Sequence, residues 1–419
     1  MRVVTDWHIH SKYSRACSKE LELPTIAKWC DRKGIQVVAT GDWTHPLWFA
    51  HLQESLIESE PGIFQLNDHS SPTRFMLAQE VSQIYKQGDK ARRVHNLIFS
   101  PSIETCSRVI AWLQKNDFNL ASDGRPILGI NSDTLYRELK AIDERIIMIP
   151  AHAWTPWYSV FGSKSGFDSL EECFGEMTPY IYAIETGLSS NPEMNWGLSS
   201  LDRVVCISNS DAHSPRNLGR EANVFNLDTL SYDEFVRVIR EQDTKRFLYT
   251  IEFFPEEGKY HFDGCALCQF SCNPTESKRL GNRCPTCGRA LTLGVANRVR
   301  ELTDRDPTAI ASRKIPFRSI VPLAEILAEV VGVSSVSSKR VEELYMRMTD
   351  EIADEFTILL ETPRDLIERV TKNLNVWVAI ERVRLGFISI KPGYDGLYGD
   401  VSIFGEGGPP LPTQSTLRL

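Results

Sequence analysis

The sequence predicts an α/β protein of two or three domains, and three observations carry this prediction. In the first half, short apolar runs alternate with amphipathic segments, which is the pattern of parallel β/α units. Five of the ten cysteines then crowd between Cys265 and Cys287. From about Asn297 onward the pattern becomes mainly helical. The length of 419 residues and the 42% share of hydrophobic residues allow each part its own core.

Seven apolar runs in the first half are predicted to be short buried strands. They are Val3–Trp7, Gln36–Thr40, Phe75–Ala78, Asn96–Phe99, Ile146–Ile149, Ile181–Ile184 and Val204–Ile207. The segments Pro24–Lys33 and Ile103–Lys115 have apolar residues at helical spacing and are predicted to be helices. Polar residues follow most of these strands. Because the loops after the strands of a β/α barrel form one face, we expect those residues to meet at one rim.

The C-terminal part is predicted to be helical and to end in a hairpin. Ile320, Leu323, Leu327 and Val330 keep helical spacing. A further helix is expected to run from Thr362-Pro363 to Gly386, because a cap residue precedes a first-turn proline and glycine often follows a helix. Phe387–Ile390 and Val401–Phe404 flank Gly393-Tyr-Asp-Gly, which indicates a small hairpin.

These patterns predict four segments. They are a β/α domain at 1–256, a cysteine-rich module at 257–296, a mainly helical domain at 297–404 that ends in the hairpin, and a flexible tail at 405–419.

Eight residues at the predicted rim are of the types that bind metal ions: His8, His10, Asp42, Glu80, His95, His152, Asp211 and His213. His8 and His10 alternate along a strand end, so both imidazoles can face one ion. An isolated histidine pair of this kind more often only forms local hydrogen bonds, but here six further residues of metal-binding type are predicted at the same rim. Mixed imidazole and carboxylate ligands suit Zn²⁺, Mn²⁺ or Fe²⁺, and bridging carboxylates allow ions about 3.5–4 Å apart.

Taken in order, these eight residues resemble the metal-site motifs of the polymerase-and-histidinol-phosphatase (PHP) family. The resemblance implies a distorted barrel of about seven β/α units, a (β/α)7 PHP barrel, with up to three metal ions. The sequence departs from the family at Trp43, where many members have a histidine directly after the aspartate. His45 is an alternative ligand for the third ion.

Longer segments across nearly the whole chain resemble the endonuclease Q family, whose PHP-type members nick DNA beside deaminated bases. These segments are 150–157, 161–174, 184–192, 194–196, 208–215, 256–265 and 392–399. The resemblance implies hydrolysis of the phosphodiester 5′ of uracil, hypoxanthine, xanthine or an abasic site by a multi-metal mechanism. It implies that the domain at 1–256 is the metal-dependent catalytic domain and that the helical domain at 297–404 binds DNA. It also implies that His8, His10, Glu80 and Asp211 are needed for catalysis, with Zn²⁺, Mg²⁺ or Mn²⁺ as the active-site metal.

The cysteine cluster has the spacing of a zinc ribbon. Cys265-x2-Cys268 and Cys284-x2-Cys287 are separated by fifteen residues, and four thiolates close a tetrahedral structural Zn²⁺ site. Cys272 could take the place of Cys268, and a redox role is the other alternative. The remaining cysteines are scattered singly and are expected to be reduced thiols.

Several residues near the predicted rim are candidates for DNA contacts. Trp154 follows His152 and could stack on an extruded base, with core packing as its alternative. The remaining candidates could bind phosphates or base edges through charge, hydroxyls or amides, and surface salt bridges are the alternative for the two arginines. They are Lys164, Ser189, Ser190, Asn191, Arg216 and Arg220.

The overall charge of −8 argues against DNA binding by bulk electrostatics, but one segment is locally basic. Between Glu276 and Arg300 six cations stand against Glu276 alone, which gives a net charge of +5. They are Lys278, Arg279, Arg283, Arg289, Arg298 and Arg300. Such a patch can neutralise phosphates, and a solvated face is the alternative.

The ends of the chain bear on location and partners. No run of 18 apolar residues is present, so no membrane association is expected. Met1–His10 lacks the apolar stretch of a signal peptide, which predicts a cytoplasmic protein. Gln414–Leu419 resembles the peptides by which repair enzymes dock on the DNA sliding clamp, with a frayed terminus as the alternative.

Two other functions remain as alternatives. The first is a PHP-type phosphatase acting on a small molecule, which would leave the ribbon and the helical domain without an obvious use. The second is a non-catalytic DNA-binding scaffold, although relic enzymes usually lose metal ligands and this sequence has nearly all of them.

Overall fold

Strand β1 (Arg2–Asp6) lies in the middle of an eight-stranded sheet with the order β16-β13-β12-β1-β2-β5-β4-β3. This is a computed structural model, and it describes residues 1–405. Strand β1 pairs in parallel with β2 and antiparallel with β12. The other strands are β2 (Val37–Ala39), β3 (Leu56–Glu60), β4 (Ile63–Leu66), β5 (Arg74–Met76), β12 (Ala222–Asn226), β13 (Phe247–Glu252) and β16 (Phe317–Ser319).

A second, four-stranded sheet with the order β8-β6-β7-β9 completes the core of the first domain, together with the parallel pair β10-β11. Its strands are β6 (Ala78–Gln87), β7 (Lys90–Phe99), β8 (Ile127–Leu128) and β9 (Ile147–Pro150), and the pair is β10 (Ala183–Glu185) and β11 (Val205–Ile207). The mixed α/β architecture is confirmed, and its strands are divided among separate hydrogen-bonded sheets.

The hairpin β6-β7 is longer than predicted, because only Ala78 and 96–99 of its residues were expected in strands, and Phe75 and Met76 of the strand predicted at 75–78 belong to β5. Ten residue pairs join β6 to β7 through the turn at Gly88-Asp89. The prediction missed most of this hairpin because its continuous apolar run is confined to Leu97–Phe99, whereas Lys86, Lys90 and Arg93 lie near its tip. Gly and Asp are frequent turn residues, so the dipeptide was the available signal.

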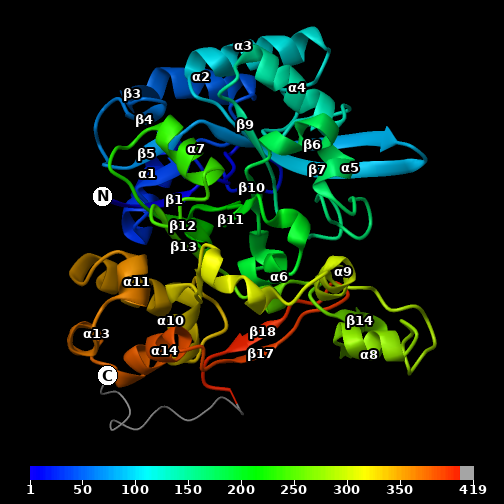
Figure 1. The fold of residues 1–419 in the computed structure, drawn as a ribbon. Helices are drawn as coiled ribbons and strands as arrows, with labels where there is room; N and C mark the ends of the chain where they lie inside the picture. The colour runs from blue at the N-terminus through cyan, green and yellow to red at the C-terminus, as the bar shows by residue number, and fades with distance from the viewer. Residues whose placement is uncertain (406–419) are drawn as a thin grey trace.

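The predicted helices of the first domain are present as α1 (Leu23–Lys33) and α3 (Ile103–Lys115). Gly34 ends α1 in the left-handed conformation with φ 83°, which glycine adopts without strain. Figure 1 shows α2, α3 and α4 grouped at one side of the domain. The remaining helices here are α2 (Pro46–Ser55), α4 (Ser132–Ile142), α5 (Leu170–Phe174), α6 (Pro192–Trp196) and α7 (Tyr232–Arg240).

The C-terminal region forms a helical body and a small cysteine-rich module, which lie apart in Figure 1. The module contains β14 (Asp263–Cys265), β15 (Phe270–Cys272) and α8 (Pro274–Arg279), followed by α9 (Val295–Leu302). The helical body contains α10 (Leu323–Val331), α11 (Lys339–Glu351), α12 (Glu355–Leu360), α13 (Arg364–Thr371) and α14 (Leu374–Arg384). The predicted hairpin is present as β17 (Ser389–Lys391) and β18 (Asp400–Ser402).

The expectation of one helix from Thr362-Pro363 to Gly386 is wrong. The chain leaves α13 at Lys372, whose φ is 51°, and α14 begins after Asn373. The Asn373 side chain accepts a hydrogen bond from the Asn375 amide, so it starts a new helix, a role that asparagine prefers to a helix interior.

Strand β16 ties the C-terminal region to the first domain, because it pairs in parallel with β13. The domain boundaries at 256 and 296 remain predictions. The tail from 406 onward, including the clamp-like peptide Gln414–Leu419, lies outside the described residues. Among residues 1–405, no helix has both the length and the apolar character needed to span a membrane.

Candidate metal centre

Six of the eight predicted ligands come together in two groups. His8, His10 and Asp211 form the first group, and Glu80, His95 and His152 form the second. Within each group the potential ligand atoms all lie within 4.8 Å of one another. The residues come from the ends of β1, β9 and β11 and from the hairpin β6-β7, so the fold brings distant parts of the chain to one place.

Glu80 connects the two groups through its two carboxylate oxygens. Its Oε2 lies 3.5 Å from His10 Nε2 and 3.7 Å from His8 Nε2. Its Oε1 lies 2.5 Å from His95 Nδ1 and 2.9 Å from His152 Nε2. A carboxylate that faces one ligand group with each oxygen has the geometry of a bridge between two ions.

The four histidine rings are oriented by hydrogen bonds on their other nitrogens, as is usual for metal-binding histidines. His8 Nδ1 lies 2.9 Å from a Glu185 oxygen, and His10 Nδ1 lies 3.3 Å from Asp42 Oδ1. His95 Nε2 is held by the Ser82 hydroxyl, and His152 Nδ1 by the Thr155 hydroxyl.

A ring nitrogen of His8 that is unpaired within the described residues indicates that this arrangement is suited to a bound cation. His8 Nε2 has no hydrogen-bond partner among residues 1–405, although it lies 3.5 Å from Asp211 Oδ1. A buried nitrogen left unpaired costs about 1–3 kcal/mol. A metal ion would satisfy this nitrogen and the nearby carboxylates together, so the donor set fits the metal site that the sequence predicts.

The two carboxylates of the centre are held in the ionised form that binds metals. Burial would raise the pKa of Glu80, but the charges of His95, Arg125 and His8 outweigh it and hold that pKa well below its usual value. For Asp211, burial acts the same way, and the charges of His8 and His10 outweigh it, so its pKa is also lowered.

The backbone is strained where it turns into the centre. Asp42, His152 and Asp211 have φ values of 43°, 31° and 47°, in the left-handed region that non-glycine residues rarely adopt. Such residues cluster at functional sites, where the surrounding structure holds them in place.

Asp42 and His213 lie beside the two groups rather than within them. One Asp42 oxygen faces His10 Nδ1, and the other accepts hydrogen bonds from the amide and hydroxyl of Ser11 and from Ser14. With both oxygens occupied, Asp42 is placed to orient His10. The His213 ring lies 4.7 Å from that of His10, and its Nδ1 contacts the Asp211 carbonyl at 2.8 Å. His45 stacks on Tyr13 and belongs to neither group.

Sequence reasoning missed two charged residues of the centre, Glu185 and Arg125. Glu185 is fully buried at the end of β10, and it accepts hydrogen bonds from His8, Asn209 and the His152 amide. Its position directly after the strand predicted at Ile181–Ile184 was an available signal. Arg125 Nη1 lies 2.8 Å from Glu80 Oε2, and its side chain is 25% exposed. It comes from a loop with no recognisable pattern.

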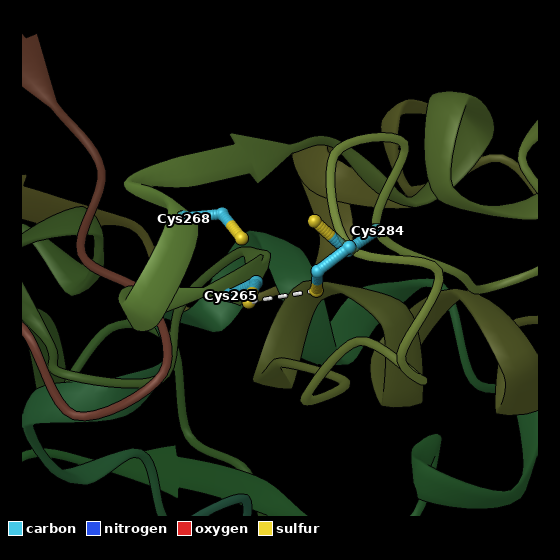
Figure 2. A group of neighbouring side chains, drawn as sticks. Cys265, Cys268 and Cys284 are labelled. Atoms are coloured by element: carbon cyan, nitrogen blue, oxygen red, sulfur yellow. Dashed lines mark hydrogen bonds between the residues drawn. The ribbon is translucent and has the colours of Figure 1, made fainter.

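The four cysteines predicted to form the ribbon site converge. Potential ligand atoms of Cys265, Cys268, Cys284 and Cys287 lie within 4.8 Å of one another. Figure 2 shows the sulfur atoms of Cys265, Cys268 and Cys284 turned toward a common point. Cys272 is buried in the same small core but is outside this group, so the structure favours Cys268 over the alternative ligand.

Trp154, the candidate for stacking on a base, lies in the core in this structure. Its side chain is only 1% exposed, and its indole nitrogen donates to Asn195 Oδ1 at 2.7 Å. In this structure Trp154 therefore packs in the core, which was the alternative to base stacking. Among the neighbouring aromatic residues, Trp157 is exposed and Tyr158 is half-buried.

The loop after β10 is also less available for DNA than expected. Ser190 is buried and donates its hydroxyl to the Thr186 carbonyl, so this hydroxyl is already used within the loop. Asn191 accepts from the Met194 amide and so caps α6. Ser189 is half-buried, and Lys164 is exposed.

The two arginines after Asp211 make protein contacts. Arg216 forms a salt bridge with Glu342 at 2.7 Å, as the alternative interpretation of this residue expected. Arg220 donates to the Ser210 and Asp211 carbonyls at 2.9 and 3.4 Å, so it supports the loop that carries a candidate ligand.

The basic segment 276–300 is partly neutralised. Arg298 donates to the carbonyls of Phe161 and Phe167 and pairs with Asp168, so it joins this segment to the first domain. Arg279 pairs with Glu276, while Lys278 and Arg289 are exposed.

Comparison with known proteins places this centre in a family. Two family models match parts of the chain, one described as PHP-associated at residues 203–244 and one as the MJ0043 C-terminal domain at residues 322–386. The lesion-specific endonuclease PfuEndoQ of Pyrococcus furiosus, known from a crystal structure, has 31% sequence identity to this chain. The match has a TM-score of 0.84 and covers 96% of this chain and 95% of that one. The chain belongs to the endonuclease Q family.

A second endonuclease Q structure, a complex with a 27-mer duplex that has an abasic lesion at the active site, is also 31% identical, with a TM-score of 0.83 over 96% of both chains. MJ0043 of Methanocaldococcus jannaschii is 29% identical over 255 residues, and the match spans 31% of its length. Family membership confirms the predicted resemblance, the fold class and the expectation of a metal-dependent endonuclease.

Proposed function

We propose that the protein is a DNA repair endonuclease that hydrolyses the phosphodiester 5′ of a deaminated base or an abasic site. The observation that carries this proposal is the pair of ligand groups joined by the two oxygens of Glu80. The endonuclease Q complex with an abasic lesion at its active site supports the substrate class. Uracil, hypoxanthine and xanthine are the deaminated bases that we propose.

The candidate ligands are His8, His10 and Asp211 for one ion and His95 and His152 for another, with Glu80 between them. Bound metal ions would lower the pKa of a water and neutralise charge on the phosphate. We propose Zn²⁺, Mg²⁺ or Mn²⁺ at this centre and Zn²⁺ at the four cysteines.

The surrounding side chains have separate tasks. Glu185 and Asp42 hold the rings of His8 and His10 in fixed orientations, which keeps the ligand geometry ready before DNA arrives. Arg125 places a guanidinium beside Glu80, where it can stabilise negative charge on the reacting phosphate. Asp211 is partly exposed, so the centre is open to a substrate from that side.

The test is a comparison of substrates with the purified, metal-loaded protein. End-labelled duplexes would carry one uracil, hypoxanthine, xanthine or abasic site, and a matched duplex would carry none. The proposal predicts a nick 5′ of the lesion and little cleavage of the undamaged duplex. Turnover of a small phosphomonoester without nicking of any lesion duplex would instead support the phosphatase alternative.

A further inference from the structure

The hairpin β6-β7 carries two candidate metal ligands at its base and extends beyond the body of the protein at its tip (Figure 1). Side chains alternate between the two faces of a strand, and directly opposed residues share a face. In this register Glu80, Ile84 and Lys86 lie on the same face as His95 and Arg93. The face that bears the metal ligands therefore continues outward to Arg93 and then to Lys86.

An aromatic ring links Arg93 to the metal centre. The Tyr158 ring lies 4.8 Å from the His95 ring, and the Arg93 guanidinium lies 5.7 Å from the centre of the Tyr158 ring. The Tyr158 carbonyl accepts a hydrogen bond from the His95 amide at 3.0 Å.

Tyr158 holds this position at an energetic cost. Its φ is 62°, and a left-handed conformation in a bulky residue costs about 1–3 kcal/mol. Strain of this kind persists where the surroundings fix a residue, and here it sets an aromatic ring between a metal ligand and a cation.

The two cations on this face are available to a ligand. Lys86 and Arg93 are exposed, and within the described chain neither has a carboxylate at ion-pair distance. Arg92, on the opposite face, is used structurally: it donates to the Gly166 carbonyl and lies 4.0 Å over the Phe167 ring. Of these two neighbouring arginines, Arg93 on the side of the metal ligands is the exposed one, and Arg92 is the one held by contacts within the protein.

We propose that Arg93 and Lys86 bind the DNA backbone on one side of the cleaved phosphate, with Tyr158 positioning Arg93 beside the metal centre. This inference rests on the proposed function. Same-face positions along a strand are about 6.8 Å apart, so the two cations stand at successive steps away from His95 and can meet separate phosphates. A net negative protein needs such local positive sites to bind DNA.

The test is the salt dependence of binding to an undamaged duplex, measured for the double variant Lys86→Ala/Arg93→Ala. Loss of two phosphate contacts should reduce the slope of log K against log salt concentration by about 1.8 in magnitude. The matched control is Arg203→Ala/Lys245→Ala, which removes the same charge. Arg203 and Lys245 are exposed and precede β11 and β13, at the ends opposite the metal ligands.

The control should keep the wild-type slope. If the Lys86→Ala/Arg93→Ala slope equals that of the control, the proposed contact is wrong. Nicking of the abasic duplex by the wild type is measured in parallel. Absent nicking would overturn the proposed function, whereas nicking with an unchanged slope would overturn only the role of Arg93 and Lys86.

Discussion

Replacement of Glu185 by glutamine should weaken metal binding at the candidate centre while leaving the fold intact. Glu185 is fully buried, and its two oxygens accept from His8 Nδ1, the His152 amide and the Asn209 side-chain amide. Glutamine has the same shape but only one accepting oxygen. Its own NH₂ group would therefore face one of these three donors.

The size of the effect follows from these contacts. Asn209 cannot simply turn around, because its oxygen already accepts from the Trp7 amide and from Asn223. One buried donor stays unpaired, which lowers the free energy of unfolding by about 1–3 kcal/mol. Loss of the carboxylate behind His8 should weaken metal affinity by about 10- to 100-fold.

The assay is a competition between the protein and a chelator, with metal content measured at each chelator concentration. Glu185→Gln should lose its active-site metal at lower chelator concentration than the wild type, while the ribbon zinc stays bound. Glu193→Gln is the control, since Glu193 is exposed on α6. Equal metal retention by the two variants would refute the orienting role of Glu185.

Two further predictions concern the ribbon and the pH dependence of stability. Cys284→Ser should release one zinc per chain and destabilise the module. Cys272→Ser should keep the zinc, because Cys272 lies outside the four-cysteine group. Equal zinc content in the two variants would contradict this site. Burial, together with nearby carboxylates, raises the pKa of Glu257 to about 8. The folded protein therefore holds a proton that the unfolded chain has released, and stability falls as pH rises from its ordinary pKa of 4.5 toward 8. Glu257→Gln should melt at a temperature increasingly above that of the wild type between pH 5 and pH 8, and a difference independent of pH would count against this explanation.

The sequence predicted the parts of the fold whose pattern is local. Helix α3 was expected at its observed bounds, and the hairpin β17-β18 was recognised from its turn. The hairpin β6-β7 was largely missed because its outer half is polar, and polar strands leave no periodic apolar signal. The break at Lys372 was missed because the apolar spacing continues across it.

The candidate site was predictable where residue type alone indicates chemistry. Histidines and carboxylates after buried strands pointed to the two ligand groups, and cysteine spacing pointed to the ribbon. The sequence could not separate candidate ligands from candidate orienting residues, because Asp42 and Asp211 have the same chemistry and differ only in what their oxygens contact. The burial of Trp154 was also not predictable, because burial depends on tertiary packing.

The most direct test of the account is metal-dependent nicking by Asp211→Asn on a duplex with one abasic site, with DNA affinity measured on the same preparation. Asp211 Oδ1 lies 3.1 Å from His10 Nε2 and 3.5 Å from His8 Nε2, so the change removes a charged candidate ligand from the first group. The account predicts that nicking 5′ of the lesion is abolished while affinity for DNA stays within a few-fold of the wild type. Full nicking by this variant, with its metal content verified, would contradict the central claim.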